Sequence, residues 1–143
     1  MASKPLNAVA RIRVVGATDL ALRGQKGASP SNPYVVLTLT ESSQPPQLFY
    51  TSVKKAESNP KWSEDFACFM CNPRKAVLHI HVLHAELGGR GDTSRNSVGL
   101  YDLSLGTTEL AFRNMAQRLR GSMILNNIEQ GKVEVDITWH RSK

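Results

Sequence analysis

The sequence predicts an all-β fold, an eight-stranded antiparallel sandwich with one short helix between its sixth and seventh strands. Three observations favour it. Short segments of alternating polar and apolar residues follow one another along the chain, and clusters of Gly, Pro, Ser and Asn separate them. Hydrophobic residues make up 41% of the 143 positions, which is enough to form a buried core. Strands with one apolar face are buried best when two sheets pack face to face.

The last strand has the clearest pattern, because polar and apolar residues alternate from Lys132 to Trp139 without interruption. Side chains alternate across a strand, so its four apolar residues must share one face. The same alternation occurs in the first, second and fifth expected strands. In chain order, the strands are expected over residues 10–14, 35–39, 48–53, 62–70, 78–82, 97–103, 119–125 and 132–139.

The segment 107–125 permits two interpretations. Its apolar residues from Phe112 to Leu119 fall at helical spacing, whereas those of 119–125 also fit a strand. We expect a short helix over 107–115 and then a strand. Loops are expected where Gly and Pro demand backbone angles that strands do not supply, over residues 24–33, 42–47 and 88–96.

The length fits one domain, expected over residues 8–140 with short tails at 1–7 and 141–143. We see no apolar run long enough for a transmembrane segment, no signal peptide and only two cysteines, so we expect a cytoplasmic protein. The net charge of +6 favours anionic partners. Aromatic residues are only 6% and do not alternate with basic ones, so no nucleic acid is expected as a partner. No nucleophile or acid/base pair stands in a recognisable context, so the chain is not expected to be an enzyme.

Two motifs carry a resemblance to a known family. Residues 31–35 read Ser-Asn-Pro-Tyr-Val, and residues 59–66 read Asn-Pro-Lys-Trp-Ser-Glu-Asp-Phe. They are similar to the Ser-Asp-Pro-Tyr-Val and Asn-Pro-x-Trp-Asn-Glu-x-Phe signatures of C2 domains. Residues 96–99 resemble the family's Asp-x-Ile-Gly, and the last strand ends in Trp139 as expected. The resemblance covers nearly the whole chain and implies a C2-type sandwich, a fold associated with calcium and phospholipid binding.

In that family, five aspartates on two loops bind calcium, and this chain has lost most of them. The signature aspartate of the first loop is replaced by an asparagine, and the other position of that loop is Lys26. Calcium needs about six to eight oxygen ligands, so we expect no calcium cofactor and no metal site. The degraded calcium-loop positions are Asn32, His84, Glu86, Asp92 and Asn96.

Permanent positive charge near the same loops suggests a different function. We expect a calcium-independent module that binds anionic phospholipids as a peripheral membrane protein. Basic residues of two loops and of one strand edge would face the headgroups, while two leucines near the loop tips would enter the interface. The residues expected to contact lipid are Leu22, Arg23, Lys26, Lys54, Lys55, Lys61, Leu87, Arg90 and Arg95.

Other interpretations remain open at this point. The same sandwich could serve as a protein-interaction adaptor without lipid, for instance for an acidic partner, or bind membranes weakly with calcium. Cys68 and Cys71 form a Cys-x-x-Cys, but Cys68 shares the inward parity of Phe66, so we expect two reduced cysteines and no disulfide. A zinc site would need His79 and His81 as further ligands, and this spacing matches no zinc motif that we can argue for.

Overall fold

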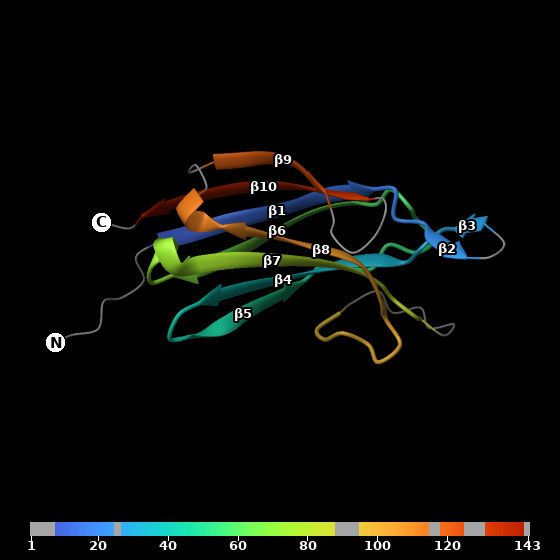
Figure 1. Ribbon diagram of the computed structural model, residues 1–143, viewed down its shortest axis with the longest axis horizontal. Coiled ribbons are helices and arrows are strands. Elements are labelled where there is room, and N and C mark those ends of the chain that lie inside the picture. Colours follow the sequence, from blue (N-terminus) through green and yellow to red (C-terminus); the bar gives the residue numbers. More distant parts are fainter. Residues whose placement is uncertain (1–7, 25–26, 88–94, 115–117, 125–130, 142–143) are drawn as a thin grey trace.

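The computed structural model describes residues 8–24, 27–87, 95–114, 118–124 and 131–141. Within these residues the chain forms ten strands and two 3-10 helices, arranged as a sandwich (Figure 1). The elements are β1 (Ala8–Thr18), β2 (Leu22–Gly24), β3 (Gly27–Ser29), β4 (Pro33–Glu41), β5 (Gln44–Tyr50), β6 (Lys61–Met70), η1 (Pro73–Lys75), β7 (Ala76–His84), β8 (Leu103–Ala111), η2 (Phe112–Asn114), β9 (Arg118–Ile124) and β10 (Lys132–Arg141).

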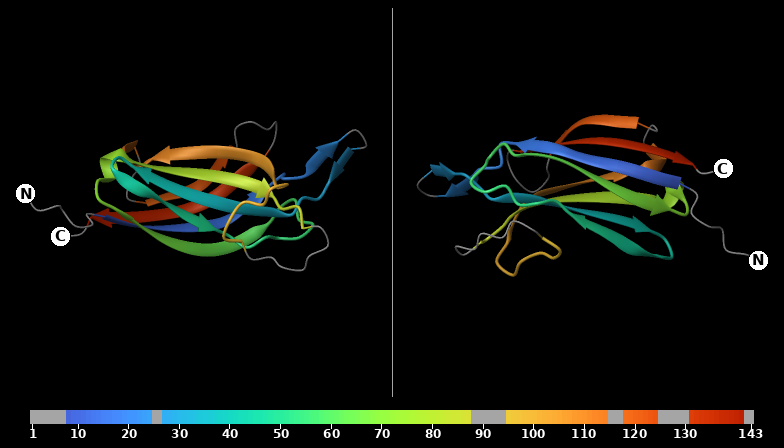
Figure 2. Two further views of the ribbon diagram at one scale, coloured as in Figure 1. Left: turned by 90° about the horizontal axis from the view of Figure 1, so that it is seen from below. Right: turned by 180° about the vertical axis from the view of Figure 1, so that it is seen from behind.

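Eight strands form the two layers. One sheet has the order β6-β1-β10-β9 and the other the order β5-β4-β7-β8, and every pairing within them is antiparallel. The short strands β2 and β3 form a separate hairpin that projects from one end of the sandwich (Figures 1 and 2). The predicted eight-stranded antiparallel sandwich is therefore confirmed.

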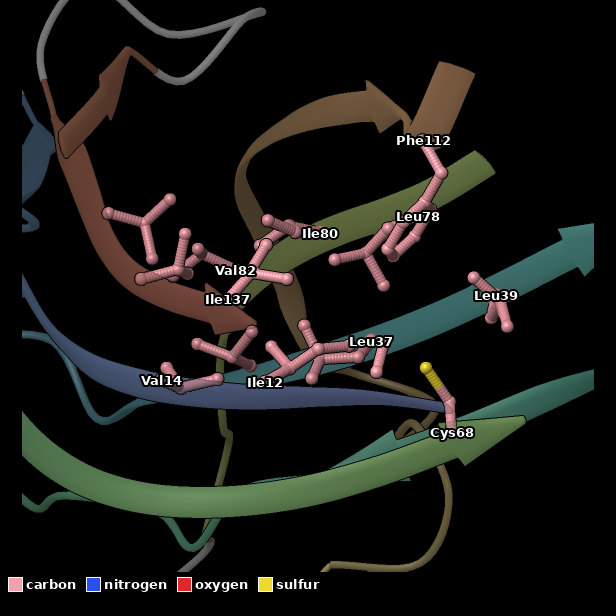
Figure 3. Packing of buried hydrophobic residues seen from close by; sticks show 14 of the residues in the cluster. Ile12, Val14, Leu37, Leu39, Cys68, Leu78, Ile80, Val82, Phe112 and Ile137 are labelled. Atoms are coloured by element: carbon pink, nitrogen blue, oxygen red, sulfur yellow. The ribbon is translucent and has the colours of Figure 1, made fainter. Parts of the chain in front are cut away.

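The core lies between the two sheets and is built from the predicted alternating residues. The inward side chains of the four best-patterned strands meet there (Figure 3). Ile12, Leu37, Ile80 and Ile137 are each fully buried, and Phe112 packs edge-on against Trp139 with ring centroids 6.1 Å apart. Each fully buried aliphatic side chain stabilises the fold by about 1.5–3 kcal/mol relative to exposure.

The Asn-Pro-Lys-Trp motif anchors the start of β6. Trp62 is buried, and its indole N–H donates to the carbonyl of Ser52 at 2.7 Å. The carbonyl oxygen of Pro60 accepts from the amide of Ala17 at 3.0 Å. A Cβ atom on Gly16 would lie 2.5 Å from that oxygen, so only glycine fits the irregularity of β1 at this point.

Two local predictions were wrong. The expected strand over 97–103 is a turn, and β8 begins only at Leu103, because the Asp102 amide donates to the carbonyl of Gly99 and closes the chain on itself. Of the described residues of the expected helix over 107–115, those from 107 to 111 belong to β8, which pairs with β7, and Phe112–Asn114 form a 3-10 helix. Ladder hydrogen bonds to β7 outweigh the helical spacing of a few apolar side chains.

Two of the expected loops also contain strands. Gly24 and residues 27–29 of the segment 24–33 belong to the β2–β3 hairpin, and β5 begins at Gln44, inside the expected loop 42–47. Pro45 and Pro46 are tolerated because β5 is an edge strand and because both lie at the irregularity of its pairing with β4, where the register assigns neither a partner.

Candidate functional site

Three connections meet at the end of the sandwich that carries the β2–β3 hairpin (Figure 1). They are the segment 19–32, the segment 51–60 and the segment 85–102. Backbone hydrogen bonds join all three: Glu57 donates to Ser31 at 2.8 Å, and Ala85 donates to Asn32, also at 2.8 Å. This end is therefore a connected structure and not a set of independent loops.

Asn32, which replaces the signature aspartate, is the residue that joins the three segments. Its side-chain oxygen accepts from the amide of Ala56 at 2.7 Å, and its side-chain nitrogen donates to the carbonyl of Ala85 at 3.2 Å. Its backbone amide donates to Nδ1 of His84 at 2.9 Å. Both ends of the side-chain amide thus have protein partners, so Asn32 acts as a structural link.

His84 and Glu86 are the first two positions predicted for the other degraded calcium loop. The His84 ring is buried and accepts a hydrogen bond at Nδ1, so its neutral form carries the proton on Nε2. That nitrogen lies 3.9 Å from the exposed Glu86 carboxylate. Asn96 is exposed, and Asp92 lies outside the described residues. Within the described part of the chain, no three His, Cys, Asp or Glu side chains are grouped to hold a metal ion.

Asp102, which was not among the predicted site residues, accepts hydrogen bonds from both ends of the segment 85–102. Its side chain is only 1% exposed, and its oxygens accept from the Tyr34 hydroxyl at 2.5 Å and from the amides of Glu86 and Gly99 at 2.9 Å each. One carboxylate thereby ties the two ends of the segment to β4. A single Asp after Asn-Ser-Val-Gly has no pattern of its own, because its partner Tyr34 lies 68 residues away in the chain.

Arg95 is directed into this network. Its guanidinium lies over the Tyr34 ring, 5.5 Å from the centroid, and its Nε is 3.9 Å from Asp102. The side chain is 19% exposed. Arg95, predicted as a lipid contact, therefore also has a structural role as the countercharge of a buried carboxylate.

The protonation states of Tyr34 and Asp102 follow from their burial and their hydrogen bonds. Burial alone would raise the pKa of Asp102, but the bonds from Tyr34 and from the two amides, together with the charge of Arg95, outweigh it and lower this pKa. Burial and then the hydrogen bond to Asp102 raise the pKa of Tyr34. Tyr34 therefore stays protonated as the donor and Asp102 stays ionised as the acceptor at neutral pH.

The turn that Asp102 closes presents a group of exposed apolar side chains. Leu100 is 88% exposed and Tyr101 is 75% exposed, and two further residues are about half exposed. An exposed apolar group on a turn that a buried carboxylate holds in place is a candidate interaction surface. We call it the apolar turn, and its members are Val98, Leu100, Tyr101 and Leu103. The expectation of a strand over 97–103 did not predict this group of exposed side chains.

The two leucines predicted to enter a membrane lie elsewhere. Leu87 is 9% exposed and belongs to a small buried cluster with Tyr34 and Val36. Leu22 is half-buried and packs against the main core. Either side chain would have to leave its neighbours to reach a lipid phase.

The structure describes some of the basic residues that were predicted to contact lipid. Lys54 is half-buried and Lys55 is exposed in the segment 51–60, and Lys61 is exposed at the start of β6. Arg23 belongs to β2, and its side chain is not described. Lys26 and Arg90 lie outside the described residues.

The cysteines and histidines outside the loops have ordinary surroundings. Both cysteines are free thiols, as expected, and burial raises the pKa of Cys68 to about 12. His79 lies between Glu109, at 3.2 Å, and the Thr40 hydroxyl, at 3.1 Å. His81 contacts the Ser104 hydroxyl at 2.9 Å, and burial lowers its pKa. Among the described residues, no helix is long and apolar enough to span a membrane.

Comparison with known proteins agrees with this architecture. Protein C2-DOMAIN ABA-RELATED 3 of Arabidopsis thaliana is 27% identical over 92% of this chain and 89% of its own length. Arabidopsis Synaptotagmin-3 is 26% identical over 76% of this chain, which corresponds to 20% of the relative. The solved C2A domain of plant Extended Synaptotagmin 1 superposes with a TM-score of 0.74 at 23% identity, covering 98% of this chain and 99% of that one.

A solved enzyme also contains this fold as a part. Human GIVD cytosolic phospholipase A2 aligns with a TM-score of 0.73 at 18% identity, over 99% of this chain but only 17% of the enzyme. The model of the C2 domain family matches residues 8–123 of this chain. With that match, the two motifs and the sheet order, the chain belongs to the C2 domain family.

Proposed function

We propose that this chain is a calcium-independent membrane-binding module, which attaches to anionic phospholipids through the apolar turn and through Lys54 and Lys55 at the same end of the sandwich. The observation that carries this proposal is the exposure of Leu100 and Tyr101 on a turn that a buried carboxylate holds in place. A turn that is already ordered loses little conformational entropy when it enters the interface.

The expected free energy of membrane binding is large enough for reversible attachment. Transfer of Leu100 and Tyr101 from water to the interface contributes about 3–5 kcal/mol. Each basic residue near an anionic surface adds about 1 kcal/mol, so Lys54 and Lys55 together add about 2. The sum of about 5–7 kcal/mol corresponds to a dissociation constant between about 0.2 mM and about 10 μM, so the domain would bind and release membranes readily.

The chemistry of the degraded calcium positions supports independence from calcium. Both ends of the Asn32 amide have protein partners, and the His84 ring is bonded to the Asn32 backbone. Of the degraded positions that the structure describes, Glu86 is the one with a carboxylate. These groups do not fit a cation that needs about six to eight oxygen ligands.

Vesicle co-sedimentation tests the proposal. The protein should bind vesicles that contain phosphatidylserine and not neutral ones, equally with calcium or with a chelator. The variant Leu100→Asp/Tyr101→Asp should weaken binding by at least about tenfold. The matched control is Leu48→Asp on β5, because Leu48 is 48% exposed but lies outside the turn.

Three outcomes would contradict the proposal. Binding that needs calcium would favour the calcium-dependent alternative, and equal loss for the Leu48 variant would mean that the turn has no special role. Failure to bind any vesicle would favour the adaptor alternative, in which the sandwich recognises proteins without lipid.

A further inference from the structure

A hollow of about 320 Å³ opens on the outer face of the sheet β6-β1-β10-β9. Arg11 and Arg13 reach it from β1, Arg118 from β9, and Asp136 and Thr138 from β10. We call it the arginine hollow. Its volume is at the lower end of the range for small-ligand sites, about 300–1,000 Å³.

The strand register sets two arginines on either side of a hydroxyl. Arg11 is opposite Thr138 in the β1–β10 ladder, and Thr138 is opposite Arg118 in the β10–β9 ladder. Neighbouring strands lie about 4.8 Å apart, so the two arginine Cα atoms are roughly 10 Å apart with Thr138 between them. Both guanidinium groups can therefore converge on one anion that lies above the threonine.

The existing ion pairs hold these two arginines through fewer or longer contacts than they hold Arg13. Arg13 holds Asp65 through two bonds, from Nε at 2.7 Å and from Nη2 at 3.0 Å, whereas Arg11 contacts the same carboxylate through one nitrogen at 2.6 Å. Arg118 is 3.6 Å from Asp136, which is longer than a good hydrogen bond. The side chains of Arg11 and Arg118 are 60% and 62% exposed. An anion can recruit both without depriving Asp65 of Arg13.

We propose that the arginine hollow binds a phosphorylated side chain within an extended segment of a partner protein. Asp65 and Asp136 act as built-in competitors, so another carboxylate, with one charge and two oxygens, would gain little by replacing them. A phosphate monoester carries about two charges and three acceptor oxygens near neutral pH. Two forked guanidinium groups and the Thr138 hydroxyl match those oxygens.

The position of the hollow favours a soluble partner over a lipid headgroup, and this step rests on the proposed membrane function. In both Figure 1 and the right panel of Figure 2, the segment 95–102 projects from one side of the sandwich, and β9 and β10 lie on the opposite side. When the apolar turn enters a membrane, the hollow faces away from it. Charges farther away than the screening length of about 8 Å contribute little to lipid attraction.

The test uses the whole chain and a defined probe. The probe is a nine-residue acidic peptide with one central phosphoserine, titrated into isotope-labelled protein without vesicles, with its unphosphorylated form as the comparison. We expect shifts of the backbone amides around Arg11, Arg118 and Thr138, and Arg11→Gln/Arg118→Gln should weaken binding at least tenfold. The matched control is Arg74→Gln/Arg113→Gln, which removes the same charge from exposed arginines of η1 and η2.

The outcomes separate this proposal from the proposed function. The Arg11→Gln/Arg118→Gln variant should still co-sediment with phosphatidylserine vesicles, and the Leu100→Asp/Tyr101→Asp variant should still bind the phosphopeptide. Equal binding of the two peptides, or equal loss in the control variant, would overturn the proposal. So would inorganic phosphate that binds as tightly as the peptide, or loss of vesicle binding in the Arg11→Gln/Arg118→Gln variant, which would make the hollow a lipid site.

Discussion

Replacement of Asp102 by asparagine keeps the shape of the side chain but removes its charge and one acceptor oxygen. In the native protein one carboxylate oxygen accepts from the amide of Glu86, and the other accepts from the Tyr34 hydroxyl and the Gly99 amide. Asparagine can satisfy only one of these sides. Its amino group would then face a donor on the other side, and the charge of Arg95 would lose its partner.

The expected loss follows from these contacts. A hydrogen bond to a charged group contributes about 1.5–3 kcal/mol, and a buried donor left without a partner costs about 1–3 kcal/mol. Asp102 is almost fully buried, so solvent screening reduces the effect little. We therefore expect Asp102→Asn to lower the free energy of unfolding by about 3 kcal/mol, or the melting temperature by roughly 10 °C. Tyr34→Phe, which removes one of the three bonds, should cost about half as much.

Urea unfolding followed by the fluorescence of Trp62 and Trp139 measures the global effect, since both rings lie in the core. Hydrogen exchange at the amides of Glu86 and Gly99 measures the local one, because both amides should exchange faster in the Asp102→Asn variant. A stability change below about 0.5 kcal/mol together with unchanged exchange at these amides would refute the assigned role of Asp102.

Three further predictions concern stability and reactivity. Gly16→Ala should destabilise the fold by about 2 kcal/mol or more, since the new Cβ would lie 2.5 Å from the Pro60 carbonyl oxygen, whereas a Cβ on Gly121 meets nothing within 4 Å. Equal melting temperatures for the two alanine variants would contradict this reason. Cys68 should resist alkylation at pH 8 until the protein unfolds, because burial raises its pKa to about 12, and rapid labelling detected by mass spectrometry would show that it is accessible. The pKa of Asp102 is lower in the folded than in the unfolded chain, so its contribution is present above about pH 4 and is lost as the pH falls through the folded value. Acid should therefore lower the melting temperature more in the native protein than in Asp102→Asn, and parallel curves would exclude this linkage.

The strands with regular alternation could be predicted because the period of a strand is local. In β10, Val133, Val135 and Ile137 are fully buried, as the pattern between Lys132 and Trp139 requires. The prolines of the two motifs likewise restrict their own backbone wherever the segment lies. The fold class, the four best strands and the family were therefore accessible without coordinates.

The candidate site depended on contacts between distant segments. The same seven residues, 97–103, contain enough apolar side chains for a strand, and only the bonds that Asp102 makes to Glu86, Gly99 and Tyr34 turn them into an exposed turn. The burial of Leu87 could not be predicted from the sequence either, because it depends on a cluster built from three separate segments of the chain.

By itself, the sequence determined which side of each regular strand faces the core, and it predicted that most of the acidic calcium ligands of the family are replaced. Only the tertiary structure decided what the replacements do. Asn32 and His84 are bonded to each other across 52 residues of chain, and Arg11 and Arg118 share a hollow because β10 lies between their strands. Side-chain periodicity is a property of neighbouring residues, whereas a hydrogen-bond network or a charged hollow exists only after the sheets have brought distant residues together.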